Sequence, residues 1–300
     1  MAEDIIAKSI FVAAQDGLRL HVQQYGTRIA QAFPAVCLPG LARTTADFDV
    51  LAPALASARQ PRQVITIDSR GRGRSGYDSN PANYNLAVEL ADIMTVLTTL
   101  EIFQAVFIGS SRGGLLTMLL GAANPAVIAG AVLHDIGPVI EPTGVARIKG
   151  YVGKLAEPRS FAEGADILRR MSVAQFPKLT DAQWLASAQR TWTMSDGKLV
   201  PTYDVRLAST LAEVDVEHPL PAMWNEFDTL AGVPILVIRG ANSDILSAAT
   251  VETMRAHHPG LETIEVPDQG HVPLLDSPDL IARITAFVER CDAGARPIPR

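Results

Sequence analysis

Residues 105–114 read AVFIGSSRGG, a stretch that joins a predicted strand to a predicted helix. The residues up to Gly109 are apolar, as in a buried strand, and helical periodicity begins at Arg112. In this context Gly109, Ser111 and Gly113 match the G-x-S-x-G nucleophile elbow, a sharp turn that exposes the serine hydroxyl at the start of a helix. Glycines on both sides avoid collisions in a backbone strained by on the order of 1–3 kcal/mol. Without the strand and the helix, the same residues would equally fit a turn with no chemistry.

Short apolar runs alternate with helical stretches along most of the chain, which predicts an α/β fold. We expect a mostly parallel central sheet with helices on both faces, because the predicted strands are apolar on both sides. An antiparallel hairpin around Asp16 and Gly17 precedes this sheet. The predicted strands are 35–38, 63–68, 105–110, 130–135, 233–240 and 261–266, and the predicted helices are 45–57, 85–100, 112–123, 247–257 and 278–291.

Residues 137–228 interrupt this alternation, since the strand signal disappears and helical segments such as 160–171 and 180–192 follow one another. Structureless loops of that length are rare in compact domains, so the segment predicts an inserted helical cap. The core domain then comprises residues 1–136 and 229–300. The insertion follows the carboxyl end of a strand, where open α/β sheets bind their ligands.

The composition excludes several classes of protein. Among 300 residues, 26 are basic and 32 acidic, and the net charge of −6 argues against a protein that binds nucleic acid or an anionic membrane surface. Cys37 and Cys291 are predicted to be free thiols. The uncharged stretch 115–133 has the length of a membrane span, but Asn124 and Pro125 divide it into a buried helix and a buried strand.

The first residues carry Glu3 and Asp4 and only a short apolar patch, unlike a signal peptide. We therefore expect a cytoplasmic protein.

A nucleophilic serine needs a general base, and the base needs an acid that orients it. His271 lies in a loop after the last predicted strand, which makes it the predicted base. Asp244 follows the strand 233–240, and the order Ser, Asp, His agrees with that of enzymes with this elbow. The competing acid is Asp135, at the end of another strand. We predict Asp244, because two strands of the sheet then carry acid and base side by side, and Asp135 would be a capping or pocket residue.

An oxyanion would be stabilised by two backbone N–H groups, one of them on the residue after the nucleophile. That residue is Arg112. The second donor is expected at Leu41, in the loop after the strand 35–38, where Gly40 lets the backbone turn inward. The alternative is a simple turn begun by Pro39 and Gly40.

Residues 71–76, GRGRSG, match the dinucleotide-binding pattern G-x-G-x-x-G. That fingerprint opens a helix, whereas here the turn-forming run 77–81 follows. We interpret the segment as a loop fixed by Asp68, Arg70 and Arg74, and we predict no NAD site.

The order of these motifs resembles the α/β-hydrolase superfamily, and specifically its capped serine esterases and lactonases. Serine at 111 argues against the haloalkane dehalogenase and epoxide hydrolase branches, whose nucleophile is an aspartate. Many relatives have His-Gly where this chain has Pro39 and Gly40, a difference that bears on the shape of the pocket. The resemblance rests on LPG at 38–40, DSRGRGRSG at 68–76, GSSRGG at 109–114, the cap insertion, Asp244, and GH at 270–271.

These residues predict a serine hydrolase that cleaves a small carboxylic ester or lactone through an acyl-enzyme. Ser111 would attack the carbonyl, His271 would transfer the proton and Asp244 would hold the imidazole. The alternatives are a hydrolase of carbon-carbon bonds beside a ketone and a non-catalytic ligand-binding protein. No metal or cofactor is implied, the expected partner is a small-molecule substrate, and the oligomeric state stays open.

Two arginines suggest a preference for substrates that carry a carboxylate. Arg112 follows the nucleophile and Arg43 lies in the facing loop, and a guanidinium pairs with carboxylates through two hydrogen bonds. The alternative is that each pairs with a structural acid, such as Asp135 or Asp47, away from the substrate. Asp135 is also a candidate pocket residue.

Overall fold

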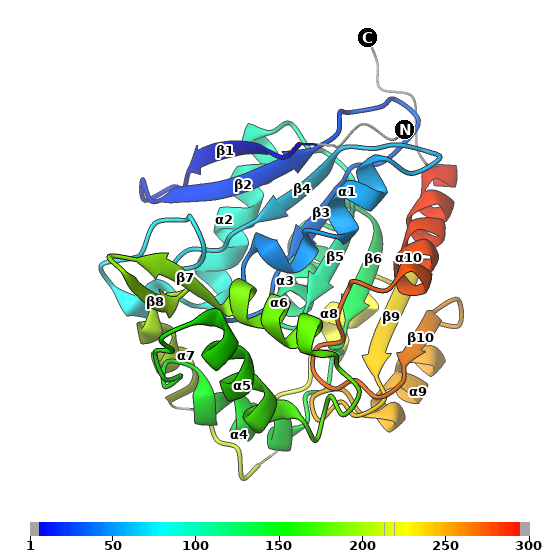
Figure 1. The fold of residues 1–300 in the computed structure, drawn as a ribbon. Coiled ribbons are helices and arrows are strands. Elements are labelled where there is room, and N and C mark those ends of the chain that lie inside the picture. The colour runs from blue at the N-terminus through cyan, green and yellow to red at the C-terminus, as the bar shows by residue number, and fades with distance from the viewer. Residues whose placement is uncertain (1–5, 213, 219, 295–300) are drawn as a thin grey trace.

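The computed structural model describes residues 6–212, 214–218 and 220–294 (Figure 1). Glu3 and Asp4, on which the expectation of a cytoplasmic protein rests, lie outside these residues. The main sheet has eight strands in the order β1-β2-β4-β3-β5-β6-β9-β10, and only the pairs β1-β2 and β2-β4 are antiparallel. This confirms the predicted sheet. Its strands are β1 (Lys8–Ala13), β2 (Arg19–Tyr25), β3 (Ala35–Leu38), β4 (Val64–Ile67), β5 (Ala105–Ser110), β6 (Ile128–His134), β9 (Ile235–Gly240) and β10 (Glu262–Val266).

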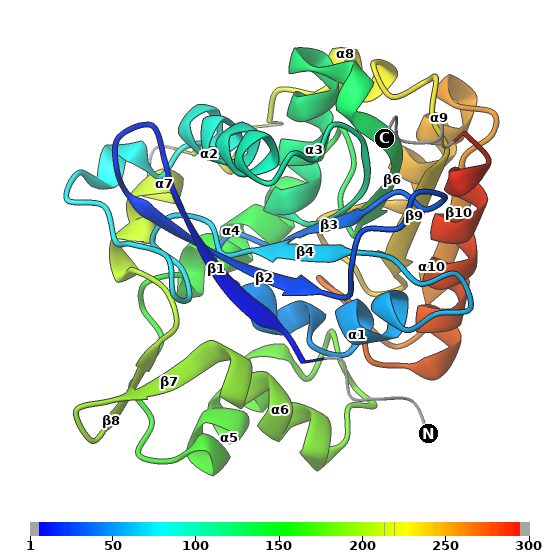
Figure 2. The ribbon, with the colours of Figure 1, turned by 90° about the horizontal axis from the view of Figure 1, so that it is seen from above.

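Helices cover both faces of the sheet, as Figure 2 shows from above. The alternation of side chains along a strand supplies both apolar layers: in β5, Phe107 packs into one core cluster and Val106 and Ile108 pack into the other. One cluster includes α1 (Leu51–Ala56) and α10 (Pro278–Cys291), and the other includes α2 (Leu86–Thr99), α3 (Arg112–Ala123), α8 (Trp224–Asp228) and α9 (Ala248–His257). Short 3-10 helices lie at Thr45–Phe48, Pro81–Asn83, Pro125–Val127, Val205–Ala208 and Asp292–Gly294.

The uncharged stretch 115–133 divides as predicted into a helix and a strand. Asn124 ends α3, and Pro125 opens a 3-10 turn that leads into β6. Within the described ranges, every helix is too short or too polar to cross a membrane. Cys37 and Cys291 are buried free thiols, as expected.

The inserted segment is not entirely helical, which corrects one expectation. Strands β7 (Trp192–Ser195) and β8 (Lys198–Pro201) form an antiparallel hairpin after α6. Asp196 and Gly197 form its turn with φ of 48° and 78°. Asp-Gly is a strong signal for such a turn, but these strands are too short and exposed to show the periodicity of a buried strand. The helices of the segment before α8 are α4 (Pro142–Tyr151), α5 (Phe161–Ser172), α6 (Asp181–Thr191) and α7 (Ser209–Ala212).

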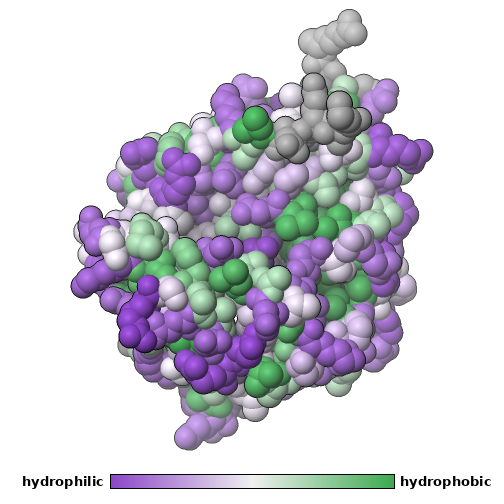
Figure 3. All heavy atoms as spheres, viewed as in Figure 1, coloured by the Kyte–Doolittle hydropathy of each residue, from purple (hydrophilic) through white to green (hydrophobic). Residues whose placement is uncertain are grey.

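Part of the segment 137–228 has a small apolar cluster of its own, while α8, at the end of this segment, packs against the main sheet layer. Trp184 and Trp192 are buried in that small cluster together with Phe176, whereas Phe227 of α8 belongs to the core cluster that includes α3. The outer side of α5 is mostly hydrophilic (Figure 3). The one-sided burial of α5 and α6 explains why helical periodicity was visible in this part of the sequence.

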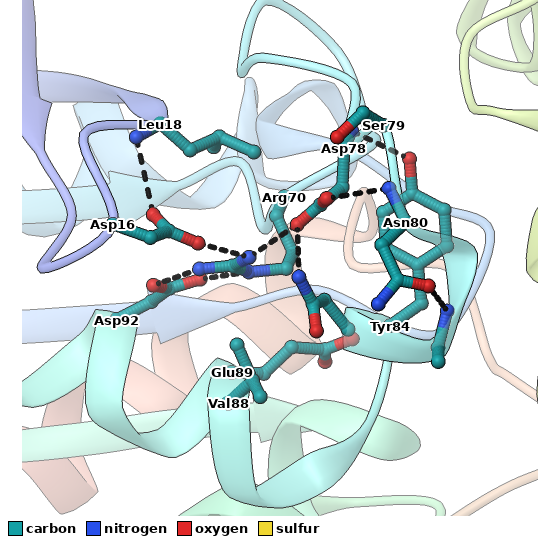
Figure 4. Close-up of polar contacts among 12 residues, drawn as sticks. Asp16, Leu18, Arg70, Asp78, Ser79, Asn80, Tyr84, Val88, Glu89 and Asp92 are labelled. Carbon is teal, nitrogen blue, oxygen red and sulfur yellow. Dashed lines mark hydrogen bonds and ion pairs between the residues drawn. The ribbon is translucent and has the colours of Figure 1, made fainter.

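Charge pairs around the buried Arg70 hold the loop 68–76 (Figure 4). Arg70 donates to both carboxylate oxygens of Asp92 at 2.7 Å, to Asp16 at 2.9 Å and to Asp78 at 2.6 Å. Asp68 accepts from His21 Nδ1 at 2.7 Å and from backbone amides. These contacts agree with the interpretation of GRGRSG as a structural loop. Arg74 differs, because its side chain donates to Ser9 Oγ and forms no ion pair among the described residues.

Candidate active site

The turn at Ser111 has the geometry of a nucleophile elbow. Ser111 has φ 50° and ψ −115°, a backbone conformation that is unusual for any residue but glycine, and α3 begins at the next residue. A Cβ at Gly109 would lie 2.5 Å from the carbonyl oxygen of Gly113, and one at Gly113 would lie 2.0 Å from that of Leu38. Because backbone atoms block both positions, only glycine fits there, which is the reason for the pattern.

Three side chains form a continuous relay at the carboxyl ends of the central strands. His271 Nε2 lies 2.8 Å from Ser111 Oγ, and His271 Nδ1 lies 2.8 Å from Asp135 Oδ2. The Asp135 carboxylate also accepts from the Gly240 amide at 2.7 Å and from Ser243 Oγ at 2.6 Å. An ionised carboxylate only accepts hydrogen bonds, so Nδ1 carries the proton and Nε2 is free to accept from the serine hydroxyl.

Among the described residues Asp244 forms no hydrogen bond with His271, and Asp135 takes the place beside the imidazole that was predicted for Asp244. Its carboxylate accepts from Arg147 Nε at 2.7 Å and Nη2 at 2.9 Å. Burial raises the pKa of Asp244, but Arg147, together with Gln175 and the charge of His271, outweighs burial and lowers the pKa below its usual value. The reason lies in strand order. Strand β6 lies between β5 and β9, so Asp135 at its end is next to the nucleophile, whereas Asp244 reaches α4 of the cap.

The two arginines expected to bind a substrate carboxylate are already paired. Arg112 Nε donates to Glu89 at 2.8 Å. Arg43 donates to both oxygens of Asp47, at 2.8 and 2.5 Å, and to Thr191 Oγ1 at 3.1 Å. Arg43 therefore pairs with a structural acid, Asp47, which the sequence analysis had named as its alternative partner. Arg112 pairs with Glu89, an acid that the sequence did not suggest.

Asp135, which was also a candidate for contact with the substrate in the pocket, is too deeply buried for that role. Its side chain is 0% exposed beneath His271, so it has no surface for a substrate.

The loop after β3 passes beside the nucleophile. A Cβ at Gly40 would lie 3.6 Å from Ser111 Cβ. In the described part of the chain, the N–H groups of Leu41 and Arg112 donate to no other group. Both predicted oxyanion donors are therefore available.

One buried carboxylate connects the two segments that carry these donors. Glu89, whose side chain is 1% exposed, accepts from Arg72 Nη1 and from Arg112 Nε, each at 2.8 Å. Arg72 Nε in turn donates to the carbonyl oxygen of Leu41 at 2.7 Å. Burial raises the pKa of Glu89, and the two guanidinium groups outweigh it and lower the pKa below its usual value. The network holds the loop after β3 against the start of α3.

A cavity of about 200 Å³ lies between core and cap, and Ser111 and His271 line it. The cap contributes mainly apolar side chains, which suit a small substrate with an aliphatic part. The apolar cap residues in its wall are Ile148, Val152, Leu155, Leu168, Met171, Phe176, Leu179 and Trp184.

His134 is a second histidine in the cavity wall, beside the relay. Its Nδ1 lies 3.1 Å from Ser110 Oγ, while its buried Nε2 has no hydrogen-bond partner among the described residues. Burial lowers the pKa of His134 from 6.5 to about 4, so the ring is neutral near pH 7. It is thus a buried, neutral histidine.

This burial predicts a loss of stability in weak acid. Below pH 6.5 the unfolded chain takes up a proton at His134, while the folded protein resists protonation until pH approaches 4, so the free energy of unfolding falls across this interval. Between pH 7 and pH 4.5 the parent should lose about 2–3 kcal/mol more than a His134→Asn variant. Urea unfolding at both pH values measures this difference, and equal losses would contradict the prediction.

Comparison with known proteins identifies the family of this chain. The model of a family described as "Alpha/beta hydrolase family" matches residues 35–284. The chain belongs to this family. It is 34% identical over 262 residues to the 3-hydroxybutyrate-oligomer hydrolase of Cupriavidus necator, covering 84% of this chain and 87% of the relative. It is 23% identical over 291 residues to 3-oxoadipate enol-lactonase 1 of Acinetobacter baylyi, covering 94% and 97%.

Among solved structures, a crystal structure of an alpha/beta hydrolase from Novosphingobium aromaticivorans is 41% identical to this α/β-hydrolase. The two superpose with a TM-score of 0.86, covering 97% of this chain and 99% of the other. The relatives are named as hydrolases, and the protein is an enzyme of that class.

The sequence identified Arg112 and Asp244 but not the residues that pair with them. These partners, Glu89 and Arg147, were not predicted, because each lies on a helix at a position typical of a solvent-exposed charge. Their pairing with Arg112 and Asp244 spans 23 and 97 positions in the sequence. For Asp135, a usable signal existed: the residue directly follows a fully buried strand, as Ser111 does.

Proposed function

We propose that this α/β-hydrolase cleaves small carboxylic esters through an acyl-enzyme, with Ser111, His271 and Asp135 as catalytic residues. The observation that carries the proposal is the relay of two 2.8 Å contacts that joins a serine on a strained elbow to a buried carboxylate. Asp135 replaces Asp244 as the proposed acid, because it alone of the two contacts the imidazole.

The mechanism follows from these contacts. Ser111 Oγ attacks the carbonyl carbon as His271 Nε2 takes its proton, and Asp135 stabilises the imidazolium. The N–H groups of Leu41 and Arg112 are the proposed donors to the oxyanion. When the tetrahedral intermediate collapses, the C–O bond breaks and Nε2–H protonates the leaving alcohol. Water then attacks the acyl-enzyme by the same proton transfers and releases the acid.

We propose short linear esters of hydroxy acids as substrates, with the cap, within residues 137–228, covering the acyl chain. Support comes from the 34% identity to the 3-hydroxybutyrate-oligomer hydrolase, over most of both chains. The cavity of about 200 Å³ and its apolar cap wall fit a short aliphatic ester. The enol-lactonase is the less similar relative, so lactones are the second substrate class to test.

The test offers the protein the linear dimer and trimer of 3-hydroxybutyrate, an enol lactone and a β-diketone of similar size. We expect 3-hydroxybutyrate to be released from the dimer and trimer, and a fluorophosphonate to stop turnover by labelling Ser111. Cleavage of the diketone but of no ester would instead favour the carbon-carbon hydrolase. A chain that neither turns over any substrate nor reacts with the fluorophosphonate would fit a ligand-binding protein.

A further inference from the structure

Three arginines line the cavity, and two of them have their guanidinium groups occupied. Arg43 is paired with Asp47, and Arg147 is paired with Asp244 through two hydrogen bonds. The third, Arg190, is half-buried. Among the residues that the structure describes, its guanidinium has neither a hydrogen bond nor an ion pair, and only its backbone carbonyl accepts a bond, from Thr202.

The position of Arg190 on α6 directs it to the cavity. Trp184, Ser187 and Thr191 also line the cavity, and they follow one another at intervals of three and four residues. Residues at such intervals share one face of a helix. Arg190 is three residues beyond Ser187 and also belongs to the cavity wall, so the last turn of α6 brings an arginine to the cavity.

In the part of the chain that the structure describes, the acids near this arginine form no ion pair with it. Burial raises the pKa of Asp49, and the positive charge of Arg190 opposes that rise, yet the two side chains form no ion pair. Asp276 is the remaining acid in the cavity wall. Its Oδ2 accepts from Gln183 Nε2 at 3.2 Å, so it is held by an amide and not by Arg190.

We propose that Arg190 binds a free carboxylate of the substrate and makes the enzyme selective for acidic esters. This inference rests on the proposed function, since it places the carboxylate in the same cavity as Ser111. A guanidinium binds a carboxylate through two parallel N–H···O bonds, which fixes both its distance and its direction. In a short oligoester of a hydroxy acid, the terminal carboxylate lies a few bonds from the ester carbonyl, within the span of one small cavity.

The test compares two substrates that differ in one charge: the linear 3-hydroxybutyrate dimer and the same dimer with its terminal carboxylate converted to a primary amide. In the parent, kcat/KM for the acid should exceed that for the amide by about 10- to 100-fold, the range for hydrogen bonds to a charged group. Arg190→Met should bring this ratio close to one, mainly by slowing the acid. Arg190→Lys should retain part of the ratio.

A matched control is Arg170→Met, which removes an exposed arginine of α5 that does not line the cavity. It should leave the ratio unchanged. A parent ratio near or below one would overturn the role of Arg190, while cleavage of the ester bond in both substrates would uphold the proposed function. Equal slowing of both substrates by Arg190→Met would also overturn the role of Arg190. If the parent hydrolyses neither substrate, the proposed function fails and the inference fails with it.

Discussion

The Ser111→Ala variant is expected to lose about 10⁶-fold in kcat for ester hydrolysis, the cost of removing the serine from a comparable triad. Without Oγ, no acyl-enzyme forms, and His271 Nε2 loses the group from which it takes a proton. The fold should persist, because the hydroxyl is directed at the cavity and contributes little to the core. Steady-state kinetics with the 3-hydroxybutyrate dimer measure the loss, and thermal unfolding checks the fold.

Ser110→Ala is the control for this prediction. Ser110 also lines the cavity, but its hydroxyl lies beside His134 rather than His271. Its replacement should cost less than about tenfold, since it removes no group that forms or breaks a bond. Activity of Ser111→Ala within tenfold of the parent would refute the assignment of the nucleophile.

The Asp135→Asn variant is expected to lose about 10⁴-fold in kcat, the cost of neutralising the acid of a serine triad. An amide at this position favours the tautomer in which Nδ1 accepts, and Nε2 then carries a proton and cannot act as the base. The buried contacts from Gly240 and Ser243 also weaken, so stability is measured alongside the kinetics. The loss should appear in kcat with the same substrate dimer.

Asp244→Asn separates the two candidate acids. It disrupts the ion pair with Arg147, which joins the cap to the core, and leaves the contact between Asp135 and His271 intact. We expect a loss far smaller than that of Asp135→Asn, on the order of tenfold or less, since an ion pair with exposed surface contributes about 1 kcal/mol or less. If Asp244→Asn were the more damaging change, the acid would be Asp244 and the relay seen here would not be the one used in catalysis.

The fold could be predicted almost completely because its signals are local. In β5, every residue is buried, and the helix signal beginning at Arg112 is equally clear. The hairpin β7-β8 escaped notice because exposed strands do not need apolar side chains, and only Asp196 and Gly197 marked it. A strand that is buried on both faces has a continuous apolar run in the sequence, whereas an exposed strand pair needs no such run.

The sequence by itself indicated the proposed nucleophile, because the steric demands of one turn fall on residues within two positions of Ser111. It also indicated His271, the proposed base, through its place after the last strand. The proposal of Asp135 over Asp244 as the acid rests on the tertiary structure alone. Both acids follow the carboxyl ends of parallel strands. Which of them contacts the imidazole depends on strand order and on the ion pair between Asp244 and Arg147.

The same distinction separates the arginines. A guanidinium pairs with whichever carboxylate the fold brings near, and sequence distance says little about that partner. Asp47 lies four residues from Arg43, so its pairing was foreseeable. Glu89 lies 23 residues from Arg112 and meets it only because α2 and α3 pack on one face of the sheet. Local sterics depend on consecutive residues, whereas charge pairing depends on which segments the fold brings together.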